Sequence, residues 1–170
     1  GDRKDESMYT SSTVVFNGQE RKMMEFDPSL PSSKRWVEQL ANKFVSTGML
    51  CHHISNNAPR NICVPEENLR KEGIETAKKW LDAASTLGAK TMRVNSGGPR
   101  LTPTAKAQGG GYPKNDEIEM YLTHAIESFK EMADHGGKVG VKVTIENHWG
   151  LTADPTNIRI IIDQVNSPWC

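Results

Sequence analysis

The stretch VTIENHWG, residues 143–150, places side chains that can do chemistry directly after a run of strand-forming residues. Glu146 offers a carboxylate that can bind a cation or transfer a proton, and His148 and Trp149 can hydrogen-bond to a substrate or stack on it. Because residues i and i+2 of a strand share a face, Glu146 and His148 would point the same way. An inward-facing carboxylate is costly without a cation or a hydrogen-bond partner. The pattern therefore favours a functional site over a glutamate that simply reaches solvent.

Polar side chains also follow two earlier strand-like runs. His53 lies on the polar side of the first run, and Asn95 comes directly after the second. Residues 95–98 read Asn-Ser-Gly-Gly, and with Arg100 they could cradle an anionic group such as a sugar phosphate, although short glycine loops are also typical of flexible turns. Because ligands bind at the carboxyl ends of parallel strands, His53, Asn95 and Arg100 are candidates for binding a substrate beside Glu146.

Four helices are predicted from apolar residues at positions i, i+3, i+4 and i+7 and from capping residues at their ends. They start after Ser32-Ser33, near Pro65, near Asn115-Asp116 and at Asp154-Pro155, and the first three end at Gly48, at Gly88 and at His135-Gly136-Gly137. Strand-like runs lie between them at residues 49–54, 91–94 and 139–145. Helices that alternate with strands favour parallel strands joined by right-handed helical crossovers, which is an α/β fold.

The alternation of side chains within the strands favours a barrel over an open sheet. Residues 141–146 alternate apolar and polar side chains, and Glu146 is on the polar side. An open doubly wound sheet, which helices cover on both faces, would favour apolar residues throughout. We therefore predict that residues 32–170 form part of a TIM-type (β/α)8 barrel with outer helices and a site at the carboxyl ends of its strands. Residues 1–31 are not assigned beyond a possible strand at Thr13–Phe16.

Composition and charge narrow the class of protein. Lys+Arg and Asp+Glu both number 21, so the formal net charge is zero at pH 7, which disfavours a nucleic-acid partner. No apolar run approaches the roughly 20 residues that span a bilayer, and the charged N-terminal residues show no export signal, so we expect no membrane partner. The 3 cysteines are an odd number without a Cys-x-x-Cys pair, which favours reduced thiols in a cytoplasmic protein.

Residues 143–168, VTIENHWGLTADPTNIRIIIDQVNSP, resemble the segment around the first metal-binding glutamate of the sugar phosphate isomerase/epimerase family, whose members are xylose isomerase-like TIM barrels. Residues 87–98, LGAKTMRVNSGG, resemble the preceding strand and loop of that family. The resemblance implies a divalent metal, Mn²⁺, Mg²⁺ or Co²⁺, held by two glutamates, an aspartate and a histidine. It further implies proton transfer through an enediolate on a sugar or sugar phosphate. Glu146 would be both a metal ligand and catalytic, and His148 and Trp149 would shape the substrate pocket.

The chain departs from this family in length. A full barrel needs about 250 residues, so 170 residues would lack the C-terminal βα units that carry the other three ligands. One carboxylate does not hold Mg²⁺ or Mn²⁺ firmly. We therefore expect this chain alone to bind no metal and to be catalytically inactive. Exposed barrel edges would make it a homo-oligomer. Two alternatives stay open: a non-catalytic assembly or binding domain on the same scaffold, and an endonuclease-IV-like phosphodiesterase, which the zero net charge disfavours.

Overall fold

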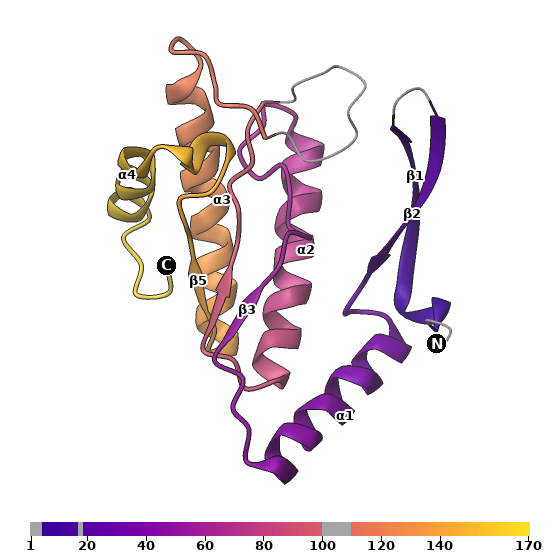
Figure 1. Ribbon diagram of the computed structural model, residues 1–170. Coiled ribbons are helices and arrows are strands. Elements are labelled where there is room, and N and C mark those ends of the chain that lie inside the picture. Colours follow the sequence, from indigo (N-terminus) through magenta and orange to yellow (C-terminus); the bar gives the residue numbers. More distant parts are fainter. Residues whose placement is uncertain (1–4, 17–18, 100–109) are drawn as a thin grey trace.

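The computed structural model describes residues 5–16, 19–99 and 110–170 (Figure 1). A two-stranded antiparallel sheet comes first in the chain, and a three-stranded parallel sheet with helices follows it. The elements are β1 (Tyr9–Phe16), β2 (Gln19–Phe26), α1 (Pro31–Thr47), β3 (His53–Ser55), α2 (Glu67–Thr86), β4 (Thr91–Arg93), α3 (Ile118–Val139), β5 (Lys142–Thr144) and α4 (Pro155–Val165), with short 3-10 helices η1 (Glu6–Met8) and η2 (Gly150–Ala153).

The three-stranded sheet confirms the predicted parallel α/β arrangement. Its strand order is β3-β4-β5, and both pairings are parallel. Each strand is only three residues long, which is shorter than the predicted runs. The first strand was predicted at residues 49–54, but it lies at His53–Ser55, because its ladder extends only as far as the short strand β4 beside it. Residues 49 and 50 are exposed instead.

Helices α2 and α3 cover one face of this sheet (Figure 1). The side chains that face them are apolar and fully buried, among them Met92 and Val143, which are paired in register on β4 and β5. On the opposite face the side chains of His53 and Lys142 are exposed. The alternation of apolar and polar residues in the strands is therefore explained by one face that packs against helices and one that lies open.

Helix α3 continues beyond the glycines at which it was predicted to end. It runs to Val139, and Gly140 caps it with φ +76°. A Cβ atom at Gly136 would collide with the carbonyl oxygen of Val141, and one at Gly137 would lie 2.9 Å from Cδ1 of Trp169. These two glycines let the helix approach β5 and the indole closely, so they serve packing and do not end the helix.

The N-terminal hairpin is joined to the rest of the fold at its base. The predicted strand at residues 13–16 lies within β1, and β2 pairs with it along its whole length. The ring of Phe26, at the end of β2, lies 5.7 Å from the ring of Trp36 on α1 and 5.7 Å from that of Trp80 on α2, measured between centroids. Glu25 forms an ion pair with Arg60 in the segment after β3. Aromatic packing and ion pairing thus fix the hairpin against two helices.

Asp27, which follows the hairpin, also contacts α2 through Lys79, and its contribution to stability depends on pH. Burial by itself would raise the pKa of the Asp27 carboxyl, but hydrogen bonds from the hydroxyl and N–H of Ser29 and the ammonium of Lys79, 3.0 Å away, outweigh it and lower the pKa below 3.8. A carboxyl whose pKa is lower in the folded state than in the unfolded state stabilises the fold at pH values above its unfolded-state pKa. This contribution is lost as the pH falls through the folded-state pKa.

We expect the Asp27→Asn variant to lose about 1–2 kcal/mol of the free energy of unfolding at pH 6, because the charge-assisted bonds weaken. At pH 3 the difference from the unmodified protein should shrink, since the carboxyl is then increasingly protonated in the unfolded chain. Urea unfolding of both proteins at the two pH values measures this. An equal difference at both pH values would contradict the role given to the Asp27 charge.

Candidate functional site

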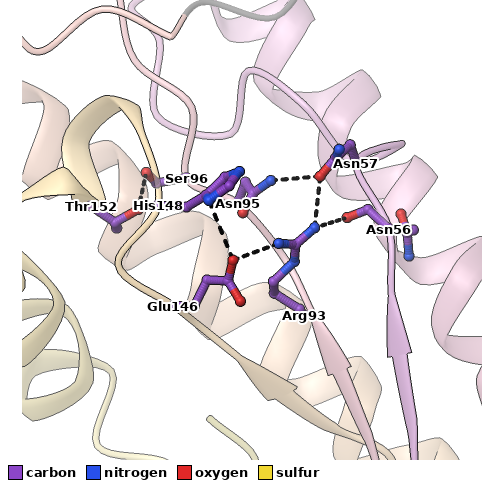
Figure 2. Close-up of polar contacts among 8 residues, drawn as sticks. All are labelled: Asn56, Asn57, Arg93, Asn95, Ser96, Glu146, His148 and Thr152. Carbon is purple, nitrogen blue, oxygen red and sulfur yellow. Dashed lines mark hydrogen bonds and ion pairs between the residues drawn. The ribbon is translucent and has the colours of Figure 1, made fainter.

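Three polar side chains lie just beyond the carboxyl ends of the parallel strands, on the open face of the sheet. Two residues after the ends of β3, β4 and β5 come Asn57, Asn95 and Glu146. Figure 2 shows these side chains directed toward one another, with Arg93 of β4 among them. The Nδ2 atom of Asn95 donates a hydrogen bond of 2.9 Å to Oδ1 of Asn57. The rim that the sequence predicts is therefore a connected polar cluster in the structure.

Arg93 is the centre of this cluster. Its Nη1 donates to Oε1 of Glu146 at 2.6 Å, and its Nη2 donates to Oδ1 of Asn57 at 2.7 Å and to the carbonyl oxygen of Asn56 at 3.4 Å (Figure 2). The guanidinium thus joins all three strand ends. Its side chain is 10% exposed, whereas that of Glu146 is 48% exposed, so a buried cation is paired with a carboxylate that solvent and small molecules can reach.

Several buried polar atoms of the cluster have no hydrogen-bond partner among the described residues. They are Oδ1 of Asn95, Nε of Arg93 and Nδ2 of Asn56. Leaving a buried donor or acceptor unpaired costs roughly 1–3 kcal/mol, so buried polar atoms of native proteins are nearly always paired with protein, water or ligand atoms. Asn95 is only 2% exposed, so its amide group is held in a fixed position within the cluster.

His148 and Trp149 form the side of the cluster that continues from β5. Nδ1 of His148 lies 3.5 Å from Oε1 of Glu146, and the ring of His148 lies 5.7 Å from that of Trp149 between centroids. Gly110 lies under the indole, where an added Cβ would come within 3.3 Å of Cε3. Trp149 is half-buried and His148 is exposed, so the imidazole has the freer access to a substrate.

The loops after β4 and β5 are packed on each other and hold this rim in place. The backbone N–H of Leu151 donates to the carbonyl oxygen of Gly97 at 2.8 Å, and Oγ of Ser96 donates to Oγ1 of Thr152 at 3.2 Å. Gly150 has φ +71°, and a Cβ there would collide with the Gly97 carbonyl. The close approach of the two loops therefore depends on glycine at this position.

Thiol chemistry is not a feature of this site. All three cysteines are free. Burial raises the pKa of the Cys63 thiol to about 12 and that of Cys170 to about 11, so neither is a thiolate at neutral pH. Cys63 is fully buried and packs in the core with its apolar neighbours. Cys51 and Cys170 are partly buried and pack against the same core.

Residues 14–170 match the family described as xylose isomerase-like TIM barrel. The chain belongs to this family. No curated protein sequence matches the chain. Solved structures show the same fold at low identity, and the chain spans about half the length of those it matches. The predictions of the family and of an α/β fold that forms part of its barrel are confirmed.

Three of these solved structures illustrate the likeness. A 3-keto-D-glucoside 4-epimerase from E. coli has 15% identity and a TM-score of 0.62, over 79% of this chain and 51% of its own. A D-allulose 3-epimerase from Methylomonas sp., in complex with D-allulose, has 13% identity and a TM-score of 0.57, over 78% and 44%. The IOLI protein with a bound zinc atom has 20% identity and a TM-score of 0.56, over 76% and 42%.

The site of this xylose isomerase-like chain does not by itself make the metal centre that the resemblance implies. Within residues 5–16, 19–99 and 110–170, no group of three or more His, Cys, Asp or Glu side chains is placed to hold a metal ion. Glu146 and His148 lie together, but the carboxylate already has the Arg93 guanidinium as its cation. Mg²⁺ and Mn²⁺ need several oxygen ligands, so this donor set does not fit them.

The structure brings together some of the predicted site residues and separates others. Asn95, Glu146 and His148 belong to one cluster, with Trp149 beside it. His53 lies apart from it, at the start of β3, where its Nδ1 is 2.8 Å from Oγ1 of Thr91. Our predicted strand ended at residue 54, which placed His53 too close to the carboxyl end. Arg100 lies outside the described residues.

Arg93 and Asn57 belong to the cluster but are not among the predicted site residues. Arg93 could have been found, because it shares the polar side of its strand with Asn95 two positions later. Asn57 carries no such signal, because it follows a strand whose end could not be predicted from the sequence.

Among the described residues, none of the helices combines the length and the apolar character that a membrane-spanning helix requires.

Proposed function

We propose that this chain is part of a sugar isomerase or epimerase in which Glu146 moves a proton at the carbon next to the substrate carbonyl. The observation that carries this proposal is the position of Glu146: a reachable carboxylate at the carboxyl end of a parallel strand, in a chain of the xylose isomerase-like family. Solved structures of the same fold include a D-allulose 3-epimerase bound to D-allulose, which supports a sugar as the substrate.

The other residues of the cluster would bind and orient the sugar. Oε1 of Glu146 is held by Arg93, which leaves Oε2 as the atom that accepts the proton. The buried Asn95 would act by holding Asn57 in place through its hydrogen bond of 2.9 Å. The exposed His148 would donate a hydrogen bond to a sugar hydroxyl or accept one from it. A wall formed by Trp149 would limit the position of the ring.

We further propose that the 170-residue chain, assayed by itself, does not turn over a sugar. Removal of the proton leaves negative charge on the former carbonyl oxygen, and stabilising that charge is usually the largest part of such catalysis. The one guanidinium of the described cluster is already paired with Glu146. A divalent metal, self-association through the edges of the parallel sheet and a cytoplasmic location remain predictions.

A binding domain without catalysis is the second candidate. The ion pair between Arg93 and Glu146 favours it, because a carboxylate with a built-in cation can recognise hydroxyl groups without a metal. Both candidates would bind a sugar at this site, but only the isomerase or epimerase would exchange a proton of the sugar with solvent. The endonuclease-IV-like alternative would require a cluster of metal-binding histidines, and the described residues provide none.

Titration of the isotope-labelled protein with D-allulose tests the proposed site. We expect the amide signals of residues 146–151 to shift in the unmodified protein, and the affinity to fall about tenfold in Glu146→Gln, because the amide lacks the negative charge that strengthens hydrogen bonds from sugar hydroxyls. Glu131→Gln is the matched control, since Glu131 is also about half-exposed and pairs with a cation, Lys78, at 2.6 Å. Absence of shifts at these residues contradicts a sugar site.

The same samples in D₂O test the absence of turnover. No deuterium should enter D-allulose, with or without added Mn²⁺, within a day at 25 °C. Exchange that depends on Glu146 would contradict inactivity and would assign catalysis to the chain alone.

A further inference from the structure

Arg93 and Glu146 differ in how firmly the surrounding residues hold them. The Arg93 side chain is 10% exposed and has hydrogen bonds to Asn57 and to the Asn56 carbonyl in addition to Glu146, so its position is fixed from three directions. Glu146 is 48% exposed, and beyond Arg93 its described polar neighbour is His148 at 3.5 Å. The guanidinium is therefore the fixed partner, and the carboxylate is the one that it holds.

The strand register explains how the two side chains meet. Arg93 is paired with Thr144 across the β4–β5 ladder, and Glu146 comes two residues later on the same side. A long side chain reaches such a diagonal neighbour easily. The backbone around both residues is tied together as well, because the N–H of Val94 donates to the carbonyl oxygen of Thr144 at 3.0 Å.

We propose that Arg93 is a positioning residue that holds Glu146 at the rim as its resident cation, and that it thereby lowers the affinity of this carboxylate for divalent metal ions. This inference rests on the proposed function in giving Glu146 the reactive role. It also accounts for the disagreement between the site and the metal centre implied by the resemblance. A guanidinium stays protonated at any physiological pH, so its charge cannot be removed by deprotonation when a metal ion approaches.

The electrostatic argument gives the direction of the effect. A divalent ion bound to the free oxygen of Glu146 would carry the same sign of charge as the neighbouring guanidinium, so the two would repel each other. Removing the positive charge removes this repulsion and frees Oε1 as a second ligand atom. The affinity for Mn²⁺ should then rise by about tenfold or more.

Mn²⁺ titration of the full 170-residue chain tests the proposal, with the electron paramagnetic resonance signal of free Mn²⁺ as one readout and paramagnetic broadening of the amides of residues 145–149 as the other. We expect Arg93→Gln to bind Mn²⁺ at this site about tenfold more tightly than the unmodified protein. Arg93→Lys, which keeps the charge, should restore the weak affinity, and Arg93→Gln combined with Glu146→Gln should lose the gain.

Arg60→Gln is the matched control, because it removes another guanidinium that is paired with a glutamate, at the hairpin. Its Mn²⁺ affinity should equal that of the unmodified protein. A folded Arg93→Gln protein that binds Mn²⁺ no more tightly than the unmodified one would overturn the proposal, as would Arg93→Lys binding as tightly as Arg93→Gln.

A second measurement does not depend on whether the Arg93 variants fold. In the unmodified protein the Nη protons of Arg93 should exchange with solvent slowly, and Glu146→Gln should speed this exchange severalfold, since Glu146 is exposed and its substitution leaves the core intact. If the Arg93 Nη protons exchange at the same rate in Glu146→Gln and in the unmodified protein, the ion pair between Arg93 and Glu146 is contradicted. Neither measurement involves a sugar, so failure of D-allulose to bind would contradict the proposed function and leave this inference standing.

Discussion

Replacing Phe129 with alanine is expected to lower the free energy of unfolding by about 3–5 kcal/mol, which is comparable to the whole stability of many domains. Phe129 lies in α3, is fully buried and is the largest fully buried side chain described. It belongs to the apolar cluster between α2, α3 and the parallel sheet, so its loss leaves a cavity under the strands that carry the site. Urea unfolding followed by circular dichroism measures the change.

Phe44→Ala is the matched control for this substitution. It removes the same ring from α1, where Phe44 is half-buried and lies outside the main apolar cluster. We expect a cost of roughly 1 kcal/mol there, because the area removed from water is smaller. Equal costs at the two positions would contradict the assignment of the core to the space beneath the parallel sheet.

Gly150→Ala is expected to have the second-largest effect, about 2–4 kcal/mol of the free energy of unfolding. The position has φ +71°, where an L side chain costs roughly 1–2 kcal/mol. The added Cβ would also collide with the carbonyl of Gly97 and lie 3.2 Å from the N of Gly98, which adds an overpacking cost of roughly 1–3 kcal/mol. The loops after β4 and β5 would move apart, and the amide signals of residues 146–151 should shift.

The chain offers a close control in Gly140→Ala. Gly140 has φ +76°, but a Cβ there would meet nothing within 4 Å. Its substitution should cost only the conformational part, roughly 1–2 kcal/mol, and leave the signals of residues 146–151 in place. If the two variants lose the same stability, the loops are not packed as tightly as the structure indicates.

Local patterns predicted much of the framework. The start of the last helix is an example: Asp154 caps α4 by accepting the N–H of Thr156 at 2.8 Å, and Pro155 is its first residue, as the sequence predicts. The same holds for side-chain direction in β5, where Val143 is buried and Lys142 is exposed. Caps and alternation depend on neighbours in the chain, which is why they can be read without a structure.

The hairpin at residues 9–26 was only partly predicted. Its second strand, QERKMMEF, is rich in charged residues and lacks a clear alternation, so it was not recognised. Its pairing with β1, rather than a local pattern, makes this segment a strand.

The periodicity of apolar residues was enough to predict that parallel strands alternate with helices and that Glu146 and Asn95 follow strand ends on the polar side. The cation that pairs with the Glu146 carboxylate could not be predicted in this way. Arg93 reaches Glu146 through the register of two strands that are distant in the chain, and Asn57 reaches Arg93 from a third. Such pairings depend on the relative positions of separate strands in space, and these are set by the packing of the helices beneath them, which no local pattern records.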